Sequence, residues 1–204
     1  MDYIEEILLQ LFIIISPIIF YQMYFNDQKL FSFKWKPHRT LLILMVCSLV
    51  MVINLLDYVL DFHSLIIMYA FLYGNRKMGF LLVVFSTIFL LFDNYVWAIH
   101  ELILIPCIYL IPYFLHPLWN KLFKKMKYVW SFMMSFTSII AHFFIIYITN
   151  LINPVELTTV KFPFFLYFSL AYIIVFFVMI YITEFIGETI KLRRAVEEYK
   201  KMMV

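Results

Sequence analysis

The stretch from Phe164 to Val204 constrains the fold of this chain most. Its first part, Phe164–Ile186, is an apolar run long enough to cross a bilayer, since about 20 such residues span the hydrocarbon core. From Gly187 onward the sequence is charged and contains no proline. We refer to residues 187–204 as the arm. A series of mostly apolar side chains begins just before the arm and continues along it at alternating spacings of four and three residues. This is the a/d pattern of a coiled coil. The expected dimer seam consists of Phe185, Thr189, Leu192, Val196, Tyr199 and Met203.

The composition places the whole chain, and not only this stretch, among membrane proteins. Hydrophobic residues make up 65% of it, compared with about 45–50% in a soluble domain. We therefore expect an all-α, polytopic transmembrane helix bundle over residues 1–186, followed by a cytoplasmic coiled-coil helix over 187–204. Cys47 and Cys107 lie within apolar runs, so we expect small membrane-buried residues and not a disulfide. The acidic start of the chain predicts no cleavable signal peptide.

The distribution of charge predicts the topology. The chain contains seven apolar runs: Ile7–Phe25, Thr40–Leu56, Ser64–Tyr73, Phe80–Phe92, Tyr95–Leu115, Val129–Thr149 and Phe164–Ile186. If all seven cross and the N-terminus lies outside, fifteen of the sixteen Lys and Arg residues fall on one side, as expected for cytoplasmic loops. A re-entrant hairpin of the short third and fourth runs is the alternative. It would leave Arg76 and Lys77 at membrane depth, at a cost of at least roughly 2.5 kcal/mol each. We thus expect a multi-pass protein of the plasma membrane with a cytoplasmic C-terminus.

Ionisable residues inside or near the apolar runs are the candidates for a signal or ligand site, because charges in a membrane are expensive. In the seven-span topology most of them gather toward the outer face. They are Asp57, Asp61, His63, Asp93, His100, Glu101 and His142. We expect them to line one outward-opening pocket that reads a proton, a cation or a small polar ligand. The alternative is that their side chains reach the membrane interface, or that they form hydrogen bonds and ion pairs with one another between helices. None has the spacing of metal ligands.

The basic side of the predicted bundle carries interfacial features. Trp35, Trp119 and Trp130 flank basic loops and are expected to be interfacial anchors. The Lys121–Lys127 cluster is interpreted as a positive-inside anchor, with recognition of anionic lipid as the alternative. Glu184 stands at the base of the last run, where it either fixes the arm or simply occupies the interface.

No motif in the sequence predicts catalysis. The chain has no nucleotide loop, no Gly-rich phosphate loop, no Ser/His/Asp arrangement and no H-E-x-x-N-P phospho-acceptor box. We expect no catalytic residue, no metal and no cofactor within this segment, and no nucleic-acid partner. Two alternatives to a signalling module remain open: a substrate-binding membrane subunit of a small-molecule transporter, and a stand-alone membrane partner or inhibitor protein.

Four short stretches resemble known sensors. The sequences PIIFYQ at Pro17–Gln22, IYITE at Ile180–Glu184 and KMMV at Lys201–Val204 resemble the membrane region of KinB-type sporulation sensor histidine kinases of endospore-forming bacilli. The turn YGNRKMG at Tyr73–Gly79 is similar to that of LytS-type multi-span sensors, although this chain has fewer glycines.

The resemblance implies the sensor half of a two-component histidine kinase. A kinase core would begin past Val204, and this core would bind ATP and Mg²⁺. Autophosphorylation would occur in trans within a homodimer, and a response regulator would receive the phosphoryl group at the head of a sporulation phosphorelay. The signal itself is not identified by the sequence.

Overall fold

Every element of the described structure is a helix, which confirms the all-α prediction. The computed structural model describes residues 3–26, 37–54, 62–93, 99, 102–103, 105–152 and 162–203. The elements are α1 (Tyr3–Asn26), α2 (Pro37–Asn54), α3 (His63–Tyr69), the π-helical segment η1 (Ala70–Gly74), α4 (Arg76–Asp93), the π-helical segment η2 (Ile105–Tyr109), α6 (Leu110–Trp119), α7 (Lys124–Ile152) and α8 (Phe162–Met202). The expected runs fall on these helices, although part of the fifth run lies outside the described residues.

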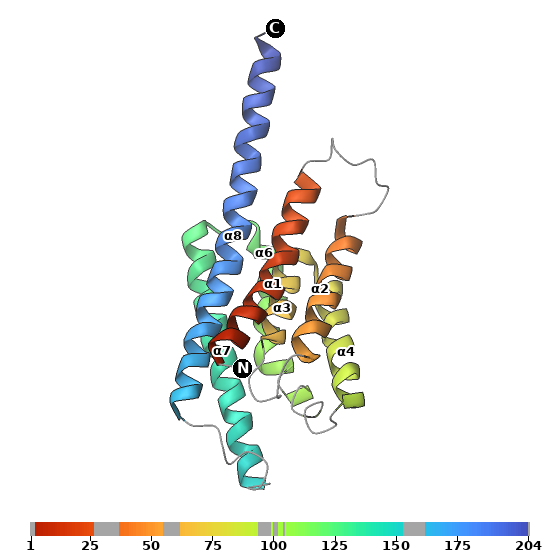
Figure 1. Ribbon diagram of the computed structural model, residues 1–204. Helices are drawn as coiled ribbons and strands as arrows, with labels where there is room; N and C mark the ends of the chain where they lie inside the picture. The colour runs from red at the N-terminus through yellow and green to blue at the C-terminus, as the bar shows by residue number, and fades with distance from the viewer. Residues whose placement is uncertain are drawn as a thin grey trace.

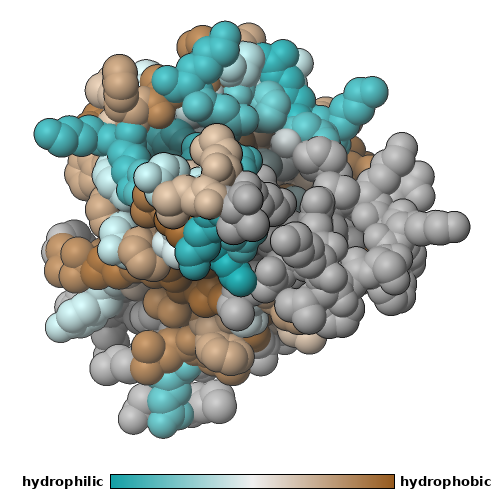
Figure 2. Space-filling view, turned by 90° about the horizontal axis from the view of Figure 1, so that it is seen from above, coloured by the Kyte–Doolittle hydropathy of each residue, from teal (hydrophilic) through white to brown (hydrophobic). Residues whose placement is uncertain are grey.

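The helices form a bundle from which the end of α8 projects (Figure 1). The helix α8 continues from Phe162 to Met202 without a break, so the last apolar run and most of the arm form one helix. In Figure 1, α1 ends and α2 begins at the end of the bundle from which α8 projects. Figure 2 looks down on this end and shows hydrophilic side chains gathered over much of it.

The short helix α3 and the segment η1 form the centre of the bundle. All residues from Phe62 to Leu72 are buried. The pair contacts α2, α4, η2 and α6, so it is enclosed by protein. With twelve residues, His63–Gly74 is about 18 Å long at 1.5 Å per residue, shorter than a hydrocarbon core of about 30 Å.

Among the described residues, two helices are long and apolar enough to cross a membrane. They are α7, over Lys124–Ile145, and α8, over Leu166–Lys200. Only 39% of each apolar window is buried inside the chain, whereas the core helix of a soluble protein is mostly buried. Length and composition therefore indicate membrane association. The apolar segments Leu8–Tyr21, Leu41–Val52 and His63–Gly74, counted only over residues whose side chains the structure describes, are shorter.

The polarity of α7 is the reverse of that in a soluble helix. Ser131, Ser135 and Ser138 are buried against the bundle, whereas Phe132 and Phe136 are exposed. Small polar residues at helix contacts and large apolar residues on the surface are typical of helices that pack in lipid. The surfaces of α4 and α8 are likewise rich in exposed apolar side chains.

The turn between η1 and α4 is compact. Helix α4 begins at Arg76, and the Asn75 side chain caps it, because its Oδ1 accepts a hydrogen bond from the Met78 N–H at 2.8 Å. Gly79 lies directly against the buried ring of Phe71. A Cβ atom at position 79 would lie 2.4 Å from that ring, closer than atoms can pack.

We expect Gly79→Ala to lower the free energy of unfolding by about 1–3 kcal/mol, as overpacking does, because the Phe71 ring must move. Gly187→Ala is the matched control, since nothing lies within 4 Å of a Cβ at that position. Both changes gain similar helix propensity, up to about 1 kcal/mol. Thermal unfolding in detergent would compare the two variants. Equal stability of both would refute the close packing of Gly79 on Phe71.

Candidate functional site

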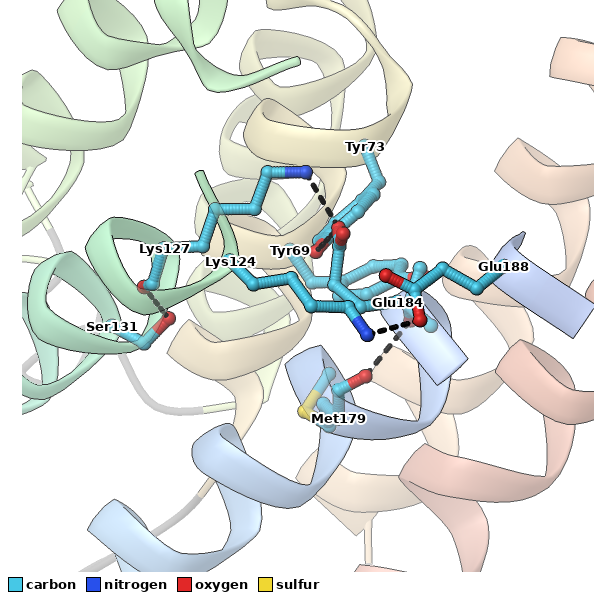
Figure 3. A network of polar contacts seen from close by, with 9 residues as sticks. Tyr69, Tyr73, Lys124, Lys127, Ser131, Met179, Glu184 and Glu188 are labelled. Atoms are coloured by element: carbon cyan, nitrogen blue, oxygen red, sulfur yellow. Dashed lines mark hydrogen bonds and ion pairs between the residues drawn. The ribbon is translucent and has the colours of Figure 1, made fainter. Parts of the chain in front are cut away.

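The most extensive polar contacts in the described bundle lie where α8 leaves it. The Glu184 side chain of α8 lies between α7 and η1, and its Oε1 accepts a hydrogen bond from the Lys127 Nζ at 2.7 Å. The Tyr73 hydroxyl donates to the same oxygen, also at 2.7 Å (Figure 3). The side chains of Lys127 and Glu184 are only 9% and 14% exposed. This is a buried ion pair with an added hydrogen bond. If either side chain were removed, the charge of the other would be left buried without a partner.

A second tyrosine holds the preceding residue of α8. The Tyr69 hydroxyl lies 2.9 Å from Thr183 Oγ1, and Thr183 Oγ1 donates to the Met179 carbonyl at 2.8 Å. Because the threonine hydroxyl has a single proton, Tyr69 is the donor in the first contact. The rings of Tyr69 and Tyr73 stack with their centroids 4.8 Å apart. Two adjacent residues of α8 are thus hydrogen-bonded to two stacked tyrosines of α3 and η1, which together form the central helix of the bundle.

The backbone between these tyrosines is π-helical. Segment η1 begins at Ala70, immediately after Tyr69, and includes Tyr73. Short π-helical turns within helices are rare and frequently occur at functional sites. The unusual turn therefore coincides with the contact between the central helix and α8.

Trp119, at the end of α6, closes the site. It is fully buried, and its ring lies edge-on to Tyr73 at a centroid distance of 5.8 Å. The Lys127 Nζ lies 5.8 Å from the Trp119 ring centroid, within the range of a cation–π contact. The expectation that Trp119 is an interfacial anchor is therefore wrong: the turn between α6 and α7 directs it into the bundle. We call the set of Tyr69, Tyr73, Trp119, Lys127, Thr183 and Glu184 the Glu184 cluster.

One turn further along α8, a more exposed ion pair joins the same two helices. The Lys124 Nζ contacts the Glu188 carboxylate, and their side chains are 38% and 51% exposed (Figure 3). The Lys121–Lys127 group is therefore not a uniform surface anchor. Lys124 and Lys127 bind α8, whereas Lys121 and Lys125 are exposed.

A second, smaller polar cluster lies deeper in the bundle around Tyr172 of α8. The buried Tyr172 hydroxyl is 2.7 Å from Ser64 Oγ of α3 and 2.6 Å from Ser138 Oγ of α7. His142 lies beside it, and its Nδ1 is 2.8 Å from the carbonyl oxygen of Ser138. This cluster joins α3, α7 and α8, three of the elements that also contribute to the Glu184 cluster.

The predicted signal pocket is described only at two of its side chains. His63 is buried at the start of α3, and His142 bonds within its own helix. Asp57, Asp61, His100 and Glu101 lie outside the described residues, as does the side chain of Asp93. The pocket therefore stays a prediction. Within the described part of the chain, no group of three His, Cys, Asp or Glu side chains is placed to hold a metal ion.

The predicted dimer seam lies on the projecting part of α8. The side chains of Leu192, Val196 and Met203 are 67%, 53% and 67% exposed. Phe185 and Tyr199 are exposed as well. The apolar stripe is thus available to a partner, directly beyond the Glu184 cluster.

Sequence reasoning missed Tyr69, Tyr73, Lys127 and Trp119 as site residues. One signal was present: Lys127, Ser131, Met134 and Ser138 recur at helical spacing and are all buried, so they mark the inward face of α7.

Comparisons with protein-family models, with curated proteins and with solved structures found no match to this chain.

Proposed function

We propose that this chain is the membrane-embedded input module of a sensor histidine kinase of the KinB type, and that α8 is its output helix. The continuity of α8 carries the proposal. One helix is packed in the bundle, anchored at Thr183 and Glu184, and then projects with an exposed a/d stripe. The sequence resemblance supports the same role and adds a kinase core and a response regulator as partners. The resemblance also suggests control of sporulation.

The proposed location is the plasma membrane, with several spans and the arm in the cytoplasm. The apolar surface of α7 and α8 supports embedding in lipid. Lys124 and Lys125 lie at the start of α7 and Lys121 lies in the turn before it; the ion pair of Lys124 with Glu188 places this region near the base of the arm. Basic residues concentrate on the cytoplasmic side of membrane proteins, which favours this orientation.

The proposed partner of the exposed stripe is a second copy of this chain. In a parallel, in-register pair of arms, Glu188 takes a g position and Arg193 of the other copy takes the facing e position. Opposite charges at g and e favour such pairing. In the described structure Glu188 contacts Lys124 of its own chain and Arg193 contacts Glu197, so the contact across the dimer would form in addition to these two pairs.

In the proposed mechanism, the Glu184 cluster sets the rotation of α8. A signal that displaces α3 and η1 changes the contacts that Tyr69 and Tyr73 make with Thr183 and Glu184. Because packed helices have discrete arrangements, such a change favours one of two packings of the paired arms. The signal acts by binding one arrangement better than the other.

Single cysteines on the arm test the proposal. In bilayer nanodiscs, Leu192→Cys, Val196→Cys and Tyr199→Cys are expected to cross-link between copies with high yield, because the seam places each pair face to face. Arg194→Cys and Glu198→Cys, which lie off the seam, are the matched controls and should cross-link poorly.

The cross-linking requires a background with Cys47→Ala and Cys107→Ala, because both native thiols are free and exposed. Cross-linking confined to the seam supports a parallel dimeric output arm. Uniform or absent cross-linking would contradict it. The arm would then be a surface helix, and a transporter subunit or a stand-alone partner protein would fit better.

A further inference from the structure

The turn between α6 and α7 and the first turn of α7 carry positive charge that the described residues do not neutralise. Lys124 and Lys127 pair with Glu188 and Glu184. Lys121 and Lys125 are exposed, and neither has an ion-pair partner among the residues that the structure describes. Two cations at one turn are therefore available to an anion from outside the chain.

An exposed apolar stripe begins immediately beside these lysines. On α7, Val129, Phe132, Phe136 and Ile140 follow Lys125 at helical spacing and are 50–55% exposed. The distance along the helix from Val129 to Ile140 is about 16 Å at 1.5 Å per residue, close to one leaflet of a hydrocarbon core of about 30 Å. The stripe thus offers a surface with the length of an acyl chain.

Phe123 lies between Lys121 and Lys125 in the sequence. Its side chain is 83% exposed, although it is a large apolar ring next to lysines. Aromatic rings among basic residues are typical of the level of the lipid headgroups, where ring and charge are both accommodated. The turn thus carries two lysines and an exposed ring, and the apolar stripe of α7 follows them, as a charged headgroup is followed by apolar chains in a phospholipid.

We propose that this surface binds an anionic phospholipid, with its headgroup phosphate at Lys121 and Lys125 and its acyl chains along the stripe of α7. Two unpaired lysines favour a lipid with net negative charge over a zwitterionic one. The bound headgroup would lie at the turn that leads into Lys124 and Lys127, and so beside the contacts that hold α8. The inference rests on the proposed membrane location, and it adds a partner that modulates the arm.

Lipid retention by the full chain tests this inference. The chain is purified in detergent with equal amounts of phosphatidylglycerol and phosphatidylcholine, and retained lipids are counted by native mass spectrometry. Wild type should retain phosphatidylglycerol in preference. In the double variant Lys121→Gln/Lys125→Gln, the ratio of retained phosphatidylglycerol to phosphatidylcholine should fall roughly 25-fold. Each basic residue near an anionic surface contributes about a fivefold gain in binding.

The control is Lys191→Gln/Lys200→Gln, which removes the same charge from exposed positions on the arm and should retain the preference. Equal retention of the two lipids by wild type, or an equal loss in both variants, would overturn the inference. Insertion into nanodiscs and seam cross-linking are measured on the same samples. Failure to insert would contradict the membrane location itself, whereas seam cross-linking without lipid preference would contradict the lipid inference alone.

Discussion

Replacing Lys127 with methionine is expected to lower the free energy of unfolding by about 3–5 kcal/mol, the typical cost of leaving a buried charge without its partner. Methionine occupies a similar volume, so lost packing contributes little. What remains is the Glu184 carboxylate, 14% exposed, with the Tyr73 hydroxyl as its one donor among the residues that the structure describes. Reversible denaturation in mixed micelles measures the change.

The double variant Lys127→Met/Glu184→Gln is expected to recover most of this loss. A neutral amide at position 184 still accepts the hydrogen bond from Tyr73, and no isolated charge is left. Lys125→Met is the matched control: it removes the same charge two residues away from an exposed position and should change stability by less than about 0.5 kcal/mol. If Lys127→Met behaves like Lys125→Met, the buried ion pair does not exist.

The second large effect is expected at Trp119. Trp119→Ala should cost about 3–5 kcal/mol, because it removes a fully buried indole that contacts Tyr73 and Lys127. Phe123→Ala is the control, since it removes an aromatic ring from the same turn that is 83% exposed. Thermal unfolding in detergent would compare them. Similar small losses in both variants would favour the original interpretation of Trp119 as an interfacial anchor.

The fold class follows from the sequence because hydropathy and the scarcity of glycine favour helix formation within each segment, independently of distant parts of the chain. The chain has only three glycines, and the absence of proline after Phe164 permits one continuous helix. The inward face of α7 and the exposed stripe of the arm follow from the same helical periodicity. These properties depend on neighbours in the sequence, so composition and spacing are sufficient to predict them.

The Glu184 cluster did not follow from the sequence because its partners are distant along the chain. Tyr73 and Glu184 are 111 residues apart, and Lys127 and Glu184 are 57 apart. Lys127 and Trp119 were assigned to the interface from residue type and flanking charge. In the structure both side chains are buried in the bundle, where they meet partners that are distant along the chain. The π-helical turn at Ala70–Gly74 likewise arises from tertiary packing.

The central claim is that the Glu184 cluster sets how the arms pair. The most direct test compares seam cross-linking in wild type with that in Lys127→Met/Glu184→Gln, a variant expected to stay folded. We predict that yields at Leu192 and Val196 fall, while those at Arg194 and Glu198 rise, because α8 rotates when the charged contact is lost. An identical cross-linking profile in a folded variant would contradict the claim.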